Sequence, residues 1–415
     1  MKTPLKKQLS GIVLNVFLMA VTFMLFAGLI EGGLRIGRIF SGTSAEEKLY
    51  DYDPLLGWKT KPNLNTALVR EGRKILLTTN SKGFRGPEIT YVPASDERRV
   101  LIVGKSFAQA VQVRFEELFS EQLKGFLADK LAESVKVINT GTAGHSTDQQ
   151  LLLFREEGVR YSPDLTIAMF HDNDVWYNNQ DYFFDKAKPR FELSGGQLVL
   201  TSTPVSKNPP KQVRTEFERS SPGLISGAKA WLTSYSLFYQ WIRERVRGNP
   251  LLFQLSVRWG LSGKNLSGIP DDFRVWKRHR DPDIDEAWKL TEKLLLQLKQ
   301  EAEKAGSDFV VFYVPSRGAI VPSQWMATLV RYGLADTQWN VNQVAEDLRA
   351  LCQKNKIALI EPTREFVAAA NSPSGSQQKL LYYVMDSHWT PEGHRVAAQV
   401  MAQWILAHPF RQKVA

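Results

Sequence analysis

The chain has 415 residues, of which 43% are hydrophobic, and a formal net charge of +10. This is enough apolar material for one large domain or two ordinary ones, and the single cysteine, Cys352, excludes a disulfide within the chain. The positive charge is concentrated in residues 205–281, which suits an acidic polymer, anionic headgroups or a solvated basic face. No nucleic-acid-binding motif accompanies it, so no nucleic acid partner is expected.

The first predicted element is an apolar helix at residues 11–30, which contain no charged side chain. Twenty helical residues span about 30 Å, the thickness of a bilayer core. Three lysines before it favour an N-terminus inside the cell, and two arginines after it weaken that bias (Lys2, Lys6, Lys7, Arg35 and Arg38). A cleaved signal peptide is the alternative, but the apolar run is long for one and no convincing A-x-A site follows. We expect residues 1–10 in the cytoplasm, 11–30 as a single-pass anchor in the cell inner membrane, and the rest on the periplasmic or extracellular side.

Residues 31–94 have the composition of a juxtamembrane extension. Turn-forming residues are frequent in "DYDPLLGWKTKPNLN" (51–65) and "NSKGFRGPE" (80–88). A buried strand is predicted next, at 100–103, and Gly104-Lys105-Ser106 follows it. These three residues match the end of a phosphate-binding P-loop, but the first glycine of that motif is replaced by Arg99. The serine must therefore be interpreted through its partners elsewhere in the chain.

Strands and helices alternate from residue 98 onward. Further strands are predicted at 135–141, 164–170, 308–316 and 357–363, and helices at 115–132, from about 148, and at 285–306, 340–355 and 390–406. The expected helix ends are Thr147 with Gln150 as a capping box, Gly306 as a stop, and Thr390 as a cap before Pro391. Continuous apolar strands that alternate with helices predict a three-layer α/β domain at 95–412, with a five-stranded parallel sheet covered on both faces.

Residues 181–282 interrupt this alternation and form a predicted basic insertion. Within it, 230–246 has the spacing of an amphipathic helix, which we expect to pack on a core in preference to a membrane surface. In the alternative arrangement, 181–282 is a separate small domain.

Reactive side chains follow the predicted strands. Ligands of parallel sheets bind beyond the carboxyl ends of the strands. Ser106 follows the first strand, Gly144 the second and Asn173 the third, and Asp386 and His388 precede the last helix. A serine becomes a nucleophile when a histidine takes its proton and an acid orients that histidine, and the oxyanion then needs fixed donors. These residues could supply each of those parts.

Four blocks in order resemble those of the SGNH, or GDSL-type, hydrolases, over about residues 50–410. They are "GKSF" (104–107), "NTGTAGHST" (139–147), "FHDND" (170–174) and "DSHWTPEGH" (386–394). The resemblance implies an SGNH hydrolase (flavodoxin-like) fold and a Ser106–His388–Asp386 triad. It implies an oxyanion hole made by the Ser106 N–H, the Gly144 N–H and the Asn173 amide. Acid and base are separated by one residue, as in membrane-anchored relatives that include polysaccharide O-acetyltransferases.

Lys105 departs from the family pattern, which normally has Asp at this position. Lysine reverses the charge beside the nucleophile, where it could distort the turn, help to hold an anionic substrate, or represent a disabling substitution. We expect its ammonium to point away from the oxyanion hole, toward an acidic neighbour such as Asp172 or Asp174. His145 and His171 are interpreted as wall residues. "HDND" lacks the ligand spacing of a metal site, so neither metal nor cofactor is expected.

The resemblance implies a serine esterase or O-acyltransferase that acts through an acyl-enzyme on an ester-bearing glycan or lipid of the cell envelope. The alternative is a weak or inactive scaffold that binds an envelope polymer or a partner protein. Some anchored relatives work beside a membrane-bound acyl-transfer partner, which leaves such a partner open here.

Overall fold

The computed structural model describes residues 4–41, 49–70, 73–128, 130–131, 133–184, 186–207, 269–372, 380–383 and 386–410, together with a few positions between 232 and 255. The chain divides into two compact units. One combines residues 1–44 with 219–266, and the other combines 45–218 with 267–415. Every candidate site residue lies in the second unit.

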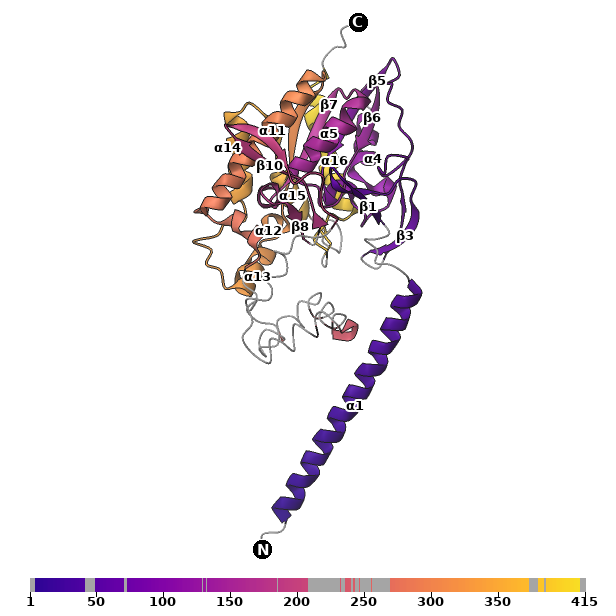
Figure 1. Cartoon of the computed structure of the whole chain (residues 1–415), viewed down its shortest axis with the longest axis vertical. Coiled ribbons are helices and arrows are strands. Elements are labelled where there is room, and N and C mark those ends of the chain that lie inside the picture. The colour runs from indigo at the N-terminus through magenta and orange to yellow at the C-terminus, as the bar shows by residue number, and fades with distance from the viewer. Residues whose placement is uncertain are drawn as a thin grey trace. The chain divides into compact units, whose positions relative to one another are not determined.

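The predicted anchor at 11–30 lies within helix α1 (Pro4–Ser41) of the first unit (Figure 1). Among the described residues, no helix meets the combined requirement of length and apolar character for crossing a bilayer. The anchor and the inner-membrane location are therefore not confirmed and stay predictions. The amphipathic helix expected at 230–246 lies mostly outside the described residues.

The second unit is built on a five-stranded parallel sheet, in the order β13-β12-β7-β5-β6. Its strands are β5 (Glu97–Val103), β6 (Ser134–Asn139), β7 (Leu165–His171), β12 (Asp308–Val314) and β13 (Ala358–Ile360). The predicted five-stranded parallel sheet is thus confirmed. The last strand is shorter than the predicted 357–363, because Pro362 lacks an N–H for the ladder and lies at the start of the next helix.

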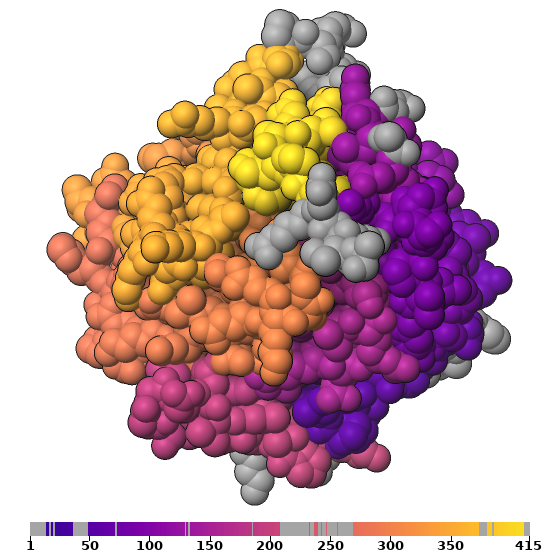
Figure 2. Space-filling model, turned by 90° about the horizontal axis from the view of Figure 1, so that it is seen from above, coloured from indigo at the N-terminus to yellow at the C-terminus, as the bar shows by residue number. Residues whose placement is uncertain are grey.

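Helices cover both faces of the sheet, which confirms the three-layer arrangement (Figure 1). Because side chains alternate along a strand, Leu101 and Val311 face one core while Ile102 and Phe312 face the other. The first core is closed by α5 (Thr147–Glu156), α11 (Pro282–Lys304) and α14 (Gln343–Lys354), and the second by α4 (Phe119–Ala128), α15 (Thr363–Asn371) and α16 (Pro391–Ala407). Cys352 is buried in the first core. Helix α16 packs on α4, and in Figure 2 the yellow C-terminal residues lie beside purple residues from the first third of the chain.

The helix ends follow most of the sequence signals. Gly306, with a φ of +84°, lies two residues beyond the end of α11. The Thr390 hydroxyl caps α16 by accepting a hydrogen bond from the Gly393 N–H at 3.3 Å. The predicted cap of α5 is wrong by one residue: Ser146 is extended and is the N-cap, so Thr147 is already helical and Gln149, not Gln150, bonds back to the Ser146 N–H. The helix predicted at 115–132 is a 3₁₀ turn followed by the shorter α4.

The part of the extension that the structure describes, from residue 49 to 94, forms hairpins that pack on the sheet domain. They are β1 (Tyr50–Asp53) with β2 (Gly57–Thr60) and β3 (Asn65–Arg70) with β4 (Arg73–Thr78). Leu56 and Phe84 are buried in the first core. This segment therefore contributes to the fold instead of serving as a simple linker.

The remaining elements of the second unit are short, and several of them belong to the predicted insertion. They are α3 (Ser106–Gln109), η1 (Phe115–Glu117), η2 (Gly158–Tyr161), α6 (Asp174–Asn178), η3 (Asp271–Trp276), α12 (Arg317–Ile320) and α13 (Pro322–Tyr332), with the hairpins β8 (Tyr182–Phe183)–β9 (Lys186–Ala187) and β10 (Arg190–Ser194)–β11 (Gln197–Thr201). The predicted insertion at 181–282 otherwise lies mostly outside the described residues.

Candidate active site

The carboxyl edge of the sheet brings Ser106, His388 and Asp386 together. Ser106 is the first residue of α3, directly after β5, and the other two lie in the loop before α16. The Ser106 Oγ lies 2.8 Å from the His388 Nε2, and the His388 Nδ1 is hydrogen-bonded to the Asp386 Oδ1. Because the carboxylate accepts a hydrogen bond from the Nδ1–H, Nε2 is left as an acceptor for the serine hydroxyl. This is the geometry of a nucleophile, a base and an orienting acid.

A glutamine that the sequence analysis did not single out completes the surroundings of Asp386. The Gln112 Nε2 donates to the Asp386 Oδ2 at 2.9 Å, so both carboxylate oxygens are bonded. Burial alone would raise the pKa of Asp386, but the hydrogen bonds from His388 and Gln112 hold it below its ordinary value. Asp386 therefore remains a carboxylate over a wider range of acidic pH than a free aspartate.

The turn after β7 carries Asn173, whose side-chain oxygen is hydrogen-bonded within the protein. The Asn173 Oδ1 lies 2.5 Å from the Lys105 Nζ and 2.9 Å from the His171 Nδ1. An ammonium only donates, and a protonated Nδ1 also donates, so two donors meet at this oxygen. Burial is the main reason why the pKa of His171 is lowered to about 3, and its imidazole is therefore neutral.

Lys105 is buried and paired with an acid. Its ammonium lies 2.9 Å from the Asp174 Oδ1, and the other oxygen of Asp174 accepts the His171 N–H at 2.7 Å. Lys105 is 5% exposed and Asp174 is fully buried. Burial raises the pKa of Asp174, and the neighbouring ammonium opposes that shift. Of the two acidic neighbours suggested for Lys105, the structure selects Asp174.

Gly144 lies in the loop 140–146, between β6 and α5. Its φ is +86°, and a Cβ atom would lie 2.8 Å from the Trp58 ring and 2.9 Å from the Phe183 ring, so only glycine fits this position. The residue before it is fixed at both backbone atoms. The Ala143 C=O accepts from the Trp58 indole at 2.9 Å, and the Ala143 N–H donates to the Gln109 side chain at 3.1 Å. Trp58 thus links the extension directly to this loop.

A second contact from the extension supports the segment after the serine. Arg85, in the "NSKGFRGPE" segment, is buried and donates to the carbonyls of Gln109, Ala110 and Val113. Burial lowers the pKa of this guanidinium to about 10. Because the Gln109 and Ala110 carbonyls end the short helix that begins at Ser106, Arg85 fixes the backbone on the C-terminal side of the serine.

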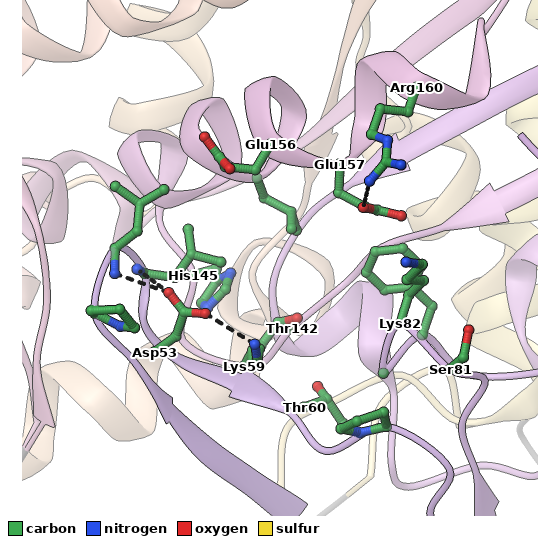
Figure 3. Close-up of a pocket in the computed structure, with 17 residues that line it drawn as sticks. Asp53, Lys59, Thr60, Ser81, Lys82, Thr142, His145, Glu156, Glu157 and Arg160 are labelled. Carbon is green, nitrogen blue, oxygen red and sulfur yellow. Dashed lines mark hydrogen bonds and ion pairs between the residues drawn. The ribbon is translucent and has the colours of Figure 1, made fainter.

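A separate cavity of about 550 Å³ lies beside the loop 140–146 (Figure 3). His145 lines it together with residues of the extension, including Asp53, whose carboxylate is bonded to Lys59 in the figure. The His145 ring bonds through Nε2 to the Trp58 C=O, and burial lowers its pKa to about 4. Neither Ser106 nor His388 lines this cavity. His145 is therefore neutral and lines this separate cavity.

The "HDND" side chains are bonded within the protein. Asp172 accepts hydrogen bonds from the Tyr313 hydroxyl at 2.7 Å and the Trp276 indole at 2.8 Å. Within the described part of the chain, no group of three or more His, Cys, Asp or Glu side chains is arranged to hold a metal ion.

A comparison with protein-family models finds a match for the C-terminal third of the chain. Residues 273–415 match the family model of the SGNH hydrolase-like domain of the acetyltransferase AlgX. This match contains Asp386 and His388 but not Ser106, Gly144 or Asn173. No curated protein matches the chain.

Solved structures that align with this chain include an acetyl xylan esterase, AlAXEase. The two share 13% identity over an alignment that covers 74% of this chain and 99% of that chain, with a TM-score of 0.37. Another is a lipase/acylhydrolase from Enterococcus faecalis (10% identity, 77% of this chain and 100% of that chain, TM-score 0.37). The five-stranded parallel sheet makes the second unit an α/β domain, and its residues 273–415 are similar to an SGNH hydrolase-like domain.

Proposed function

We propose that the protein is a serine-dependent esterase or O-acyltransferase, with Ser106 as the nucleophile, His388 as the general base and acid, and Asp386 as the residue that orients His388. The observation that carries the proposal is the chain of hydrogen bonds from the Ser106 Oγ through His388 to Asp386. The similarity of residues 273–415 to an SGNH hydrolase-like acetyltransferase domain supports acyl chemistry at a coarse level.

In the first half-reaction, the Ser106 hydroxyl gives its proton to the His388 Nε2 while Oγ attacks the ester carbonyl carbon. The C–O bond to the leaving alcohol then breaks, and His388 returns the proton to that alcohol. In the second half-reaction, water or a sugar hydroxyl gives a proton to His388 and attacks the acyl carbon. The bond to the Ser106 Oγ then breaks while His388 returns that proton to Oγ, which regenerates the serine and the neutral histidine. Water as acceptor gives hydrolysis, and a sugar hydroxyl gives transfer.

The proposed oxyanion hole consists of the Ser106 N–H, the Gly144 N–H and the Asn173 Nδ2. Two features support it. Gly144 has a positive φ, and hydrogen bonds hold the neighbouring residue Ala143, so the loop backbone is fixed. The Asn173 side-chain oxygen is bonded to Lys105, which leaves the amide nitrogen as the free end of the side chain. Donors fixed before the reaction stabilise the developing charge without reorganising.

The buried pair of Lys105 and Asp174 favours the enzyme over the inactive scaffold. A lysine that disabled the site would direct its ammonium at the position of the acyl oxygen. Its ammonium instead bonds the Asn173 Oδ1 and the Asp174 carboxylate. We therefore place the scaffold second.

The direct test measures hydrolysis of p-nitrophenyl acetate by the full chain purified in detergent, with Ser106→Ala beside Ser372→Ala, an exposed serine at the end of α15, as the matched control. We expect Ser106→Ala to lose at least about 10³-fold in kcat/KM and Ser372→Ala to lose nothing. Fluorophosphonate labelling followed by peptide mass spectrometry should modify Ser106. Turnover that survives Ser106→Ala would refute the proposal.

We further propose that residues 11–30 anchor the protein in the inner membrane and that its substrate is an ester-bearing glycan or lipid of the cell envelope. The uncharged length of this segment and the lysines before it support this location. In membrane fractions of expressing bacteria, the full chain should resist alkaline carbonate extraction, and protease added to spheroplasts should cleave the second unit. Extraction by carbonate, or protection from the protease, would contradict the location.

A further inference from the structure

We infer that Lys105 is a positioning residue for the reaction: held by Asp174, its ammonium fixes the Asn173 side chain so that the amide nitrogen is available to the acyl oxygen. This inference rests on the proposed function. It assigns a role to the residue at which the chain departs most clearly from the SGNH pattern.

The first step of the argument is the orientation of the Asn173 amide. An asparagine side chain has one end that accepts and one that donates, and the two ends are nearly identical in shape. At Asn173 the end that faces Lys105 must be the oxygen, since an ammonium can only donate. The His171 Nδ1 lies 2.9 Å from the same oxygen, and the neutral tautomer protonated at Nδ1 donates to it. The NH₂ end is therefore directed away from both donors, and rotation of the amide by 180° would oppose donors to donors.

The second step is the rigidity of Lys105 itself. A lysine side chain is flexible when exposed, but this one is 5% exposed and bonds two acceptors. Asp174 is fixed in turn, because its second oxygen accepts the His171 N–H. The hydrogen bonds thus form a closed network through Lys105, Asn173, His171 and Asp174. This network joins the turn after β5, which carries the serine, to the turn after β7, which carries the amide.

The third step concerns the charge. An aspartate at position 105, as in the usual family block, would set a second buried carboxylate beside Asp174. Two neighbouring buried carboxyl groups repel each other when both are ionised, so without a cation at least one of them would stay protonated. The acid beside the nucleophile turn is thus supplied by position 174 in this chain, and the cation by position 105. Accordingly, Lys105→Asp should damage the site and not restore it to a more active form.

The test is a double-mutant cycle with p-nitrophenyl acetate and the full chain in detergent. Its variants are Lys105→Met, Asn173→Ala and the two together. Loss of one oxyanion donor typically lowers kcat by about 10²–10³-fold. We expect Asn173→Ala to fall in this range, Lys105→Met to lose at least about 10-fold in kcat with KM changed less than about 3-fold, and the double variant to be no slower than Asn173→Ala. A residue that acts only through Asn173 has nothing left to position once that amide is absent.

Two results would overturn the inference. One is a Lys105→Met variant with wild-type kcat. The other is a double variant whose loss is the product of the two single losses, because Lys105 would then act independently of Asn173. These results differ from failure of the proposed function itself. In that case the wild type would show no turnover dependent on Ser106 and no fluorophosphonate adduct at that serine.

Two further variants separate positioning from folding. Lys105→Met leaves the Asp174 charge buried without its cation, so Lys105→Met with Asp174→Asn removes both charges and should show the same loss in kcat when folded. Lys188→Met is the matched control, since it removes an equally buried ammonium bonded to Asp148 but not to Asn173. It should lower the melting temperature without the selective loss in kcat. An equal loss of kcat in Lys188→Met would assign the effect to stability and reject the inference.

Discussion

Asp172 is a buried carboxyl with two neutral donors, and its ionisation should make stability depend on pH. Burial raises its pKa to about 6, from an ordinary value of 3.8. Because the pKa of Asp172 is higher in the folded state than in the unfolded state, protonation of Asp172 stabilises the fold. This contribution to the free energy of unfolding is fully present below pH 3.8 and is lost as pH rises through 6. The loss amounts to about 3 kcal/mol, from roughly 1.4 kcal/mol for each unit of pKa.

We therefore expect wild type to lose about this much stability between pH 4 and pH 8, beyond any loss in Asp172→Asn. The free energy of unfolding of the variant minus that of wild type should thus be larger at pH 8 than at pH 4 by about 3 kcal/mol. Urea denaturation of both proteins at the two values of pH measures the difference, and groups that titrate equally in both proteins cancel. Parallel pH curves for the two proteins would contradict the raised pKa.

Gly144 is expected to tolerate no side chain. Gly144→Ala adds a Cβ atom within 3 Å of the Trp58 and Phe183 rings at a φ that alanine disfavours, so the backbone N–H must move. The kcat for p-nitrophenyl acetate should fall by about 10²-fold or more, in the range for a lost oxyanion donor. Gly125→Ala in α4 is the control, since its Cβ atom would meet no atom within 4 Å, and it should leave kcat unchanged. Wild-type kcat in Gly144→Ala would remove this N–H from the oxyanion hole.

At the scale of elements, the N-terminus of α16 determines where the loop that carries Asp386 and His388 ends. The Thr390 hydroxyl accepts from the Gly393 N–H and donates to the Leu380 C=O. Thr390→Ala should lower the free energy of unfolding by about 1 kcal/mol, the usual value of an N-cap, whereas Thr390→Ser keeps the oxygen and should cost much less. Urea melts of the three proteins decide this, and equal losses in both variants would show that the methyl group, not the cap, is important.

The elements that the sequence predicted well are those whose signal is local. Long apolar runs mark the buried strands such as β5 and β12, and Gly306 and Thr390 mark helix ends. The hairpins of residues 50–78 were not predicted, because their strands have four to six residues and short polar alternations resemble turns.

The site was predicted to the extent that topology determines it. Carboxyl ends of parallel strands meet at one edge, so the gathering of Ser106, Asn173 and His388 could be expected. The bond from Gln112 to Asp386 and the bond from Lys105 to Asn173 could not, since each joins residues far apart in the chain through particular rotamers. No periodicity or spacing in the sequence encodes such a pair.

At the scale of the whole molecule, the extension and the sheet domain should behave as one folding unit. Without residues 45–94, the absence of Leu56 and Phe84 leaves gaps in the first core, and the loop 140–146 loses its bond to the Trp58 indole. A protein that begins at residue 45 should melt cooperatively and hydrolyse p-nitrophenyl acetate, whereas one that begins at residue 95 should aggregate or lack a cooperative transition by circular dichroism. A folded, active protein from residue 95 would show that the extension is dispensable.

The position of Cys352 has a practical consequence for spectroscopy. This cysteine is the only one in the sequence, its side chain is 1% exposed in the first core, and burial raises the pKa of its thiol to about 12. Maleimides and methanethiosulfonates react with the thiolate, which is scarcely populated there at neutral pH. A second cysteine placed on the surface would therefore be the single reactive one in the native protein. Spin labels or fluorophores attached in this way could report distances to a lipid bilayer or a glycan while the native core keeps its own thiol.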